Sequence, residues 1–151
     1  TMERDGIKMR VFGDVTGLPL QLQNLVAKTN EISTHYSGFQ ANICLNYGGR
    51  DEIVRAAKKF NAEAQSRRER GESDEDVFSA CLDTAGIPDP DLIIRTSGEL
   101  RLSNFLLWQA AYAEFVFTDV LWPEFTPAVF ADCIKTYLGR TRRFGKVVES
   151  I

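Results

Sequence analysis

The chain has few cysteines, no excess of positive charge and no apolar run long enough to span a bilayer. Its cysteines, Cys44, Cys81 and Cys133, lack the spacing of a metal site and lie in apolar patterns, so we expect buried thiols in a reducing compartment. The net charge of −3 argues against nucleic acid as the main partner. No secretory signal is recognised, and we expect a cytoplasmic protein.

What the sequence does contain is the composition of a globular domain. The 151 residues are 44% hydrophobic and 26% charged, which is enough to bury a core. Strands are expected near residues 8–12, 39–45, 92–94 and 115–117, and helices near residues 19–36, 51–60, 73–82 and 126–138, with Ser73 and Thr126 as N-caps. This alternation predicts an α/β fold with an open, mostly parallel sheet and helices on both faces.

The most informative stretch begins at the expected strand 92–94. Arg95 stands at its carboxyl end, and a tight loop leads to Arg101. Ser103 is placed as the N-cap of a helix expected over residues 104–109. Two guanidinium groups and a hydroxyl would then converge on a helix start, where free N–H groups and the helix dipole favour an anion. The pattern predicts a diphosphate pocket beyond the carboxyl end of a strand.

Glu114 follows this expected helix and directly precedes the strand 115–117. A carboxylate close to a diphosphate would be repelled unless a divalent cation lay between them, and Mg²⁺ is the usual bridge. Glu114 is therefore a candidate magnesium ligand. A second interpretation stays open, in which the two arginines pair with Glu99 and Asp91 as ordinary surface charges and Glu114 is solvated.

Two other features permit competing interpretations. Gly48 and Gly49, at a strand-to-helix junction, could cradle a phosphate, but we favour a tight turn that leads into the helix 51–60. The acidic residues around Asp74 are interpreted as the first turn of the helix capped by Ser73, and not as a metal site. There they interact favourably with the positive end of the helix dipole.

The stretch from Arg95 to Phe125, RTSGELRLSNFLLWQAAYAEFVFTDVLWPEF, resembles the C-terminal signature of the cis-prenyltransferases, the undecaprenyl diphosphate synthase family. The similarity extends to VFGDVTGLP, LNYGGRDEIVRA and RRFG, and so covers nearly the whole chain. The first half of the family's catalytic domain has no counterpart. The resemblance therefore implies one partial domain over residues 1–151, with the N-terminal strands and helices of the fold missing.

The resemblance also implies an activity. Members of the family condense isopentenyl diphosphate onto an allylic diphosphate, here expected to be farnesyl diphosphate, and the default product is the lipid carrier undecaprenyl diphosphate. Carried over onto this sequence, the substrate-binding residues are Arg95, Arg101, Leu102, Ser103, Arg143 and Gly145. Glu114 would share Mg²⁺ with an aspartate that precedes the matched region, so no catalytic residue is expected in this chain, and we expect no turnover from it alone.

Arg143 and Gly145 match the family's Arg-x-Gly motif, which reaches across a dimer interface to the partner's diphosphate. This implies a homodimer, although cations after a helix C-terminus are also a common surface feature. A lipid product implies peripheral association with the inner face of the membrane.

Three other functions compete with this interpretation, and one of them is a generic phosphate-binding module unrelated to prenyl chemistry. The all-helical prenyl synthases use Asp-Asp-x-x-Asp motifs, which are absent here. A non-catalytic partner subunit of a heteromeric cis-prenyltransferase would keep the fold and the tail. Such subunits lose the Arg-Thr-x-Gly-Glu and Arg-x-Ser-Asn elements, and this sequence retains both.

Overall fold

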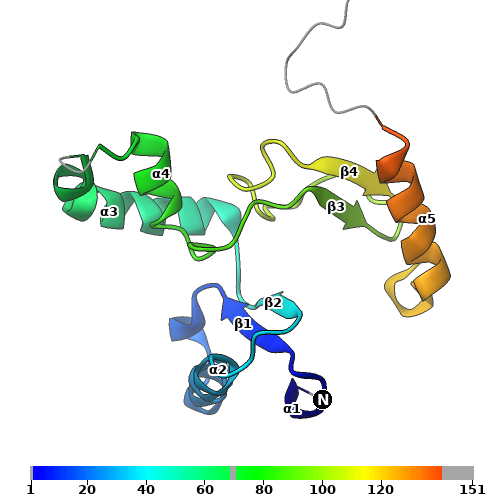
Figure 1. Cartoon of the computed structure of the whole chain (residues 1–151), viewed down its shortest axis with the longest axis horizontal. Coiled ribbons are helices and arrows are strands. Elements are labelled where there is room, and N and C mark those ends of the chain that lie inside the picture. The colour runs from blue at the N-terminus through cyan, green and yellow to red at the C-terminus, as the bar shows by residue number, and fades with distance from the viewer. Residues whose placement is uncertain (1, 69–70, 141–151) are drawn as a thin grey trace, which may run out of the picture. The chain divides into compact units, whose positions relative to one another are not determined.

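A computed structural model describes residues 2–68 and 71–140, with the side chains of residues 2, 3 and 63–68 left undescribed (Figure 1). Arg143 and Gly145 lie outside the described residues. Internal contacts divide the chain into two compact units at the junction between Ile87 and Pro88. The first unit precedes this junction and the second follows it, and each is described by itself.

The first unit is built on two parallel strands, β1 (Lys8–Phe12) and β2 (Gln40–Cys44), paired in register from Lys8 opposite Gln40 to Phe12 opposite Cys44. A short helix, α1 (Met2–Asp5), precedes β1, and the 3-10 turn η1 (Val15–Gly17) follows it. The paired strands confirm the expectation for residues 8–12 and 39–45.

The helix α2 (Leu20–Ser33) lies against the edge of β1 that does not face β2 (Figure 1). The backbone N–H of Val11 donates to the side-chain oxygen of Asn30 over 3.0 Å, and the N–H of Met9 donates to the hydroxyl of Ser33. Polar side chains of α2 therefore accept hydrogen bonds from N–H groups of β1 that would otherwise donate to the carbonyls of a further strand.

The helices α3 (Gly49–Arg68) and α4 (Asp74–Ser79) complete the first unit. The prediction that the first of these ends near Phe60 is wrong, because Ala, Glu, Gln and Arg continue the helix beyond it and all have high helix propensity. Ser73 caps α4 as predicted, with its side chain accepting from the N–H of Asp76. The apolar contact between the helices includes buried Val77 and Ala56 and the ring pair Phe60–Phe78, with centroids 5.9 Å apart.

The second unit carries another parallel pair, β3 (Leu92–Arg95) and β4 (Glu114–Phe117). After β4 come the 3-10 turn η2 (Trp122–Glu124) and the helix α5 (Pro127–Leu138), which Thr126 caps as predicted. Val116 of β4 and Cys133 of α5 are buried, and the two elements pack together. The α/β class and the parallel pairing are confirmed, and the described strands form two pairs, one in each unit.

The helix predicted over residues 104–109 is wrong. Residues 103–112 form successive turns instead, and Ser103, Asn104 and Leu106 adopt positive φ angles of 49°, 64° and 45°. Residues in the left-handed region cannot continue a right-handed helix. Ser103 is consequently not an N-cap, and the anion site based on that helix start is not formed.

The cysteines are free, as expected. Cys81 and Cys133 are buried, while Cys44 is half-buried. Burial is the main cause that raises the pKa of the Cys44 thiol. Within residues 2–68 and 71–140, no helix is long and apolar enough to cross a membrane.

Candidate functional site

Arg95 is held at the carboxyl end of β3 by hydrogen bonds between the segments that follow the two strands. The N–H of Thr118 donates to the carbonyl of Arg95 over 2.9 Å. The N–H groups of Ser97 and Gly98 donate to the carbonyls of Val120 and Thr118 over 2.9 and 3.0 Å. The loop between the two arginines is thus anchored at the end of the sheet where open α/β sheets bind ligands.

Gly98 is required by the geometry of this loop. Its φ angle of 68° lies in the left-handed region. A Cβ atom at this position would lie 3.0 Å from a carboxylate oxygen of Asp119. Glycine therefore allows the loop to turn tightly beside the chain that leaves β4.

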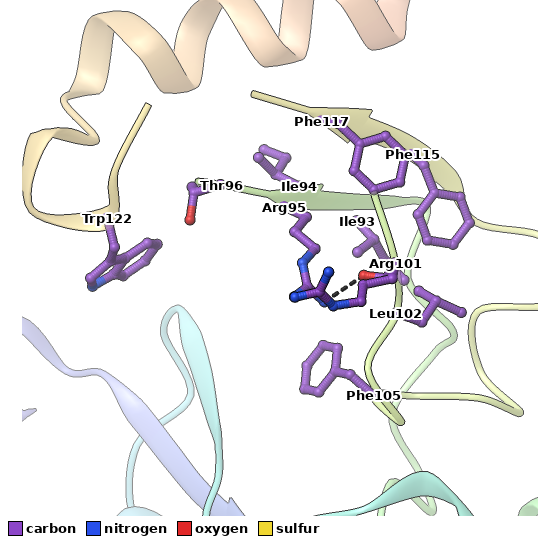
Figure 2. Close-up of a pocket in the computed structure, with 10 residues that line it drawn as sticks. All are labelled: Ile93, Ile94, Arg95, Thr96, Arg101, Leu102, Phe105, Phe115, Phe117 and Trp122. Carbon is purple, nitrogen blue, oxygen red and sulfur yellow. Dashed lines mark hydrogen bonds between the residues drawn. The ribbon is translucent and has the colours of Figure 1, made fainter. Parts of the chain in front are cut away.

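The two arginines have different partners (Figure 2). The guanidinium of Arg95 donates to the backbone carbonyl of Arg101 and forms no ion pair with another described residue. Arg101 pairs with Glu99, and both side chains are exposed. The surface-charge interpretation is thus correct for Arg101 and Glu99, and the pair is weak enough for an anion to compete with it.

A cavity of about 260 Å³ brings both arginines together. Its wall is mostly apolar and is formed by Ile93, Ile94, Arg95, Thr96, Arg101, Leu102, Phe105, Phe115, Phe117 and Trp122 (Figure 2). Of the predicted substrate-binding residues, Arg95, Arg101 and Leu102 line it. Ser103 is exposed and does not belong to the wall. The sequence pattern missed the aromatic wall, because its members come from three separate segments.

Glu114 lies at the other end of the strand pair. The parallel register places it opposite Leu92, whereas Arg95 is opposite Phe117. Three residues along a strand correspond to about 10 Å, so the sheet separates this carboxylate from the cavity's arginines. Glu114 accepts a hydrogen bond of 2.9 Å from Arg140, which also donates to the carbonyl of Phe115 over 2.8 Å.

The described residues do not provide a complete metal site. Glu114 retains 29% of its side-chain exposure, so an ion could reach it, but its carboxylate is paired with Arg140. In the part of the chain that the structure describes, no three His, Cys, Asp or Glu side chains gather in a group that could hold a metal ion. Mg²⁺ is usually bound by one or two carboxylates together with waters and substrate phosphates, so Glu114 could supply at most part of its ligands.

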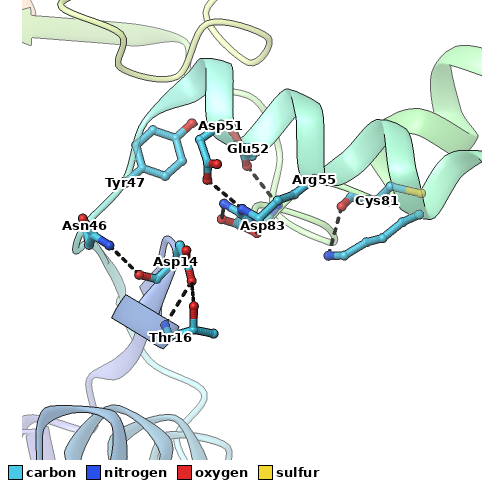
Figure 3. Close-up of polar contacts among 10 residues, drawn as sticks. Asp14, Thr16, Asn46, Tyr47, Asp51, Glu52, Arg55, Cys81 and Asp83 are labelled. Carbon is cyan, nitrogen blue, oxygen red and sulfur yellow. Dashed lines mark hydrogen bonds and ion pairs between the residues drawn. The ribbon is translucent and has the colours of Figure 1, made fainter. Parts of the chain in front are cut away.

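The first unit contains a different polar cluster (Figure 3). Arg55 forms two hydrogen bonds of 2.7 Å with Asp83 and another of 2.8 Å with Asp51. Glu52 is buried and accepts from the hydroxyl of Tyr47 over 2.5 Å and from the N–H of Asp83 over 2.9 Å. Sequence spacing signals only the Asp51–Arg55 contact, one helical turn apart.

This cluster reinforces the junction between β2 and α3. The N–H of Glu52 donates to the carbonyl of Gly48 over 2.9 Å, and α3 begins at Gly49. The preferred interpretation of the glycine pair, a turn that leads into a helix, is confirmed. A second, polar cavity lies beside this turn and is lined by Asp14, Asn46, Tyr47, Gly48 and Asp51. Its two carboxylates, Asp14 and Asp51, would repel a phosphate.

Comparison with known proteins shows which family this chain resembles. The profile of a family described as putative undecaprenyl diphosphate synthase matches residues 1–145. An isoprenyl transferase of Chlamydia muridarum is 48% identical over 141 residues, which are 93% of this chain and 56% of that protein. An isoprenyl transferase of Prochlorococcus marinus is 45% identical over 97% of this chain and 54% of that protein. The chain thus spans just over half the length of these curated relatives.

Solved structures agree with the sequence comparison. Lavandulyl diphosphate synthase from Lavandula x intermedia, crystallised with dimethylallyl diphosphate, is 38% identical, with a TM-score of 0.83 over 93% of this chain and 61% of that one. A probable undecaprenyl diphosphate synthase from Campylobacter jejuni is 34% identical, with a TM-score of 0.82 over 97% of this chain and 66% of that one.

Proposed function

The chain belongs to the undecaprenyl diphosphate synthase family, the cis-prenyltransferases, and from this premise we propose that its second unit forms the isopentenyl diphosphate site of an isoprenyl transferase. The observation that carries the proposal is the guanidinium of Arg95. It lines a cavity beside Arg101 and has no acidic partner among the described residues. A cation held in that way is available to an anionic ligand.

The two guanidinium groups suit a diphosphate. A planar guanidinium can donate two parallel hydrogen bonds to phosphate oxygens, which fixes the orientation of the ligand as well as its position. Arg101 would exchange Glu99 for the ligand, at little cost because the existing pair is exposed. Leu102 would contribute through its backbone and Ser103 through its hydroxyl, which requires the exposed Ser103 side chain to turn toward the ligand.

The whole reaction that we propose is the condensation of isopentenyl diphosphate with an allylic diphosphate, farnesyl diphosphate, to form undecaprenyl diphosphate as a lipid carrier. The contribution of these residues is to position the alkene of isopentenyl diphosphate and to neutralise its diphosphate. The allylic substrate and the catalytic aspartate need residues beyond those matched here. We accordingly propose that this chain alone does not turn over.

We propose Mg²⁺ as the cofactor, by analogy with the family. When bound, it would neutralise diphosphate charge. Glu114 would supply one carboxylate after releasing Arg140, and further ligands would have to come from beyond the described residues. The described donor set is incomplete, so no step is assigned to the ion.

The remaining parts of the proposal concern assembly. Arg143 and Gly145, outside the described residues, would complete the diphosphate site of a second copy in a homodimer. The enzyme would work in the cytoplasm, peripherally at the inner face of the membrane where its lipid product is used. The proposed homodimer rests on the resemblance of the tail to the Arg-x-Gly motif, and the proposed membrane association rests on the proposed lipid product.

Titration calorimetry with isopentenyl diphosphate tests the proposed site. Arg95→Gln and Arg101→Gln should each weaken binding by about 10- to 100-fold, because each removes a charge-assisted pair of hydrogen bonds. Lys135→Gln is the matched control, since Lys135 is an exposed cation of the same unit already paired with Asp132. Unchanged affinity in both arginine variants, or no binding by the parent chain, would contradict the proposal.

A further inference from the structure

The outer edge of β1, which faces away from β2, carries two backbone donors. Alternate N–H groups of a strand point to opposite edges of its sheet. The N–H of Lys8 points toward β2 and donates to the carbonyl of Phe39 over 2.9 Å. The N–H groups of Met9 and Val11 donate to α2 instead. These two donors are the ones that a further strand would use.

Two side chains of α2 accept hydrogen bonds from both donors. Asn30 and Ser33 are three residues apart, so they lie on one face of the helix. The N–H of Val11 donates to the side-chain oxygen of Asn30 over 3.0 Å, and the N–H of Met9 donates to the hydroxyl of Ser33. The helix thus offers two oxygen acceptors where a neighbouring strand would offer two carbonyls.

Burial indicates that these polar side chains serve the strand. Ser33 retains 1% of its exposure, and Asn30 is half-buried. A polar group in such a place costs free energy unless it is hydrogen-bonded. Apolar side chains could also pack α2 against β1, but they would leave the N–H groups of Met9 and Val11 without acceptors. The polar pair therefore matches the edge of the strand specifically.

The strand itself is suited to further pairing. Residues 7–12, IKMRVF, contain β-branched and aromatic side chains of high strand propensity. In the described part of the chain, β1 belongs to a sheet of two strands, and sheets of this size are marginally stable without other support. An unpaired strand edge is also a template for pairing with another chain. Closing this edge therefore prevents association.

We propose that α2 is an edge lock: Asn30 and Ser33 keep the outer edge of β1 closed, and releasing them lets β1 pair with a strand of a second copy of this chain. The partner is a second copy because every copy carries the same edge, so two open edges can pair around a two-fold axis. The inference concerns the first unit and does not depend on the proposed diphosphate site.

Removing both acceptors tests the lock. In the 151-residue chain, the double variant Asn30→Leu and Ser33→Ala should open the edge. Light scattering after size-exclusion chromatography should then give an average mass at least about twofold that of the parent at the same concentration. An unchanged mass in a double variant that keeps the circular dichroism spectrum of the parent would overturn the inference.

Two matched variants control for other causes of association. Asn24→Leu adds the same apolar side chain at an exposed position of α2 that makes neither hydrogen bond to β1. Asn30→Asp keeps an oxygen acceptor for the N–H of Val11. Both variants should keep the mass of the parent. An equal increase of mass in Asn24→Leu would attribute association to the added leucine and overturn the lock.

Hydrogen–deuterium exchange then locates the contact. In the associated double variant, residues 8–12 should exchange about tenfold more slowly than in the same variant diluted until it dissociates. Association that leaves the exchange of residues 8–12 unchanged would place the contact elsewhere and overturn the inference. If the double variant unfolds, Asn30→Ala removes one acceptor alone and takes its place, with the same increase of mass expected and an unchanged mass counting against the lock.

Discussion

The two units differ in the partners of their arginine side chains. In the first unit Arg55 is enclosed by Asp83 and Asp51, and only 27% of its side chain is exposed. In the second unit Arg95 faces a cavity and has no acidic partner among the described residues. An arginine whose hydrogen bonds are used within the fold stabilises it, whereas one that lacks an acidic partner is available to a ligand.

The backbone at the strand ends also differs between the two units. At the end of β1, the chain passes so close to β2 that a methyl group added at Gly13 would overlap the carbonyl oxygen of Leu45. At the end of β3, the corresponding glycine, Gly98, faces only the side chain of Asp119, which can move. The glycine after β1 is thus confined by backbone atoms, whereas the glycine after β3 meets only a side chain.

The largest effect should come from Gly13→Ala. Its φ angle of 115° and the overlap with backbone atoms leave no room for a methyl group, so we expect a loss of more than about 3 kcal/mol in the free energy of unfolding. Urea denaturation followed by circular dichroism measures it. Gly86→Ala is the control, since Gly86 also has a positive φ but nothing lies within 4 Å of an added Cβ.

Arg55→Leu should have the next largest effect, about 2–3 kcal/mol of unfolding free energy, because it leaves the partly buried carboxylate of Asp83 without its main partner. Lys135→Ala removes an ion pair in which both side chains are more than 70% exposed, and it should change the unfolding free energy by less than about 0.5 kcal/mol. Equal losses in the two variants would remove the contrast between the units.

Arg95→Lys should act on binding instead of stability. The substitution keeps the charge but loses the forked geometry, so isopentenyl diphosphate should bind about tenfold more weakly, or about 1.4 kcal/mol. The urea midpoint should stay that of the parent, because no acid depends on Arg95 in the described structure. A shifted midpoint with unchanged affinity would make Arg95 a structural residue like Arg55.

Acid should produce the smallest effect, and it should act through the first unit. The hydrogen bonds from Arg55 hold the pKa of Asp83 below its ordinary value. The stability contributed by this carboxylate is therefore fully present above the ordinary aspartate pKa of about 3.9, and it is lost as the pH falls through the lowered value. The difference in unfolding free energy between the parent and Asp83→Asn should shrink between pH 7 and pH 3. A difference that stays constant would exclude Asp83 as the titrating group.

Local signals in the sequence predicted much of the fold correctly. Ser73 and Thr126 cap helices where the sequence placed them, because the hydroxyl and the N–H that it satisfies are three residues apart. The strands were also found, since short apolar runs bounded by turn residues need little tertiary context. The parallel pairing was predicted from the alternation of strands and helices, and the structure confirms it.

Long-range geometry explains the errors. The segment after Arg101 has apolar residues at helical spacing, but positive φ angles at Ser103 and Asn104 break the helix. The local sequence does not predict these angles. Arg55 and Asp83 are far apart in the sequence, so their pairing could not be read from it. Glu114 was expected near the arginines because it follows them along the chain, whereas the strand register places it at the opposite end of the sheet.

Hydrogen–deuterium exchange with and without isopentenyl diphosphate tests most directly where a diphosphate binds. The account predicts slower exchange in residues 93–105 and 114–122, which surround the cavity of Arg95 and Arg101, and unchanged exchange in residues 13–16 and 46–51, which surround the polar cavity of the first unit. Protection confined to residues 46–51 would assign the diphosphate to the Gly48–Gly49 turn instead and contradict the account.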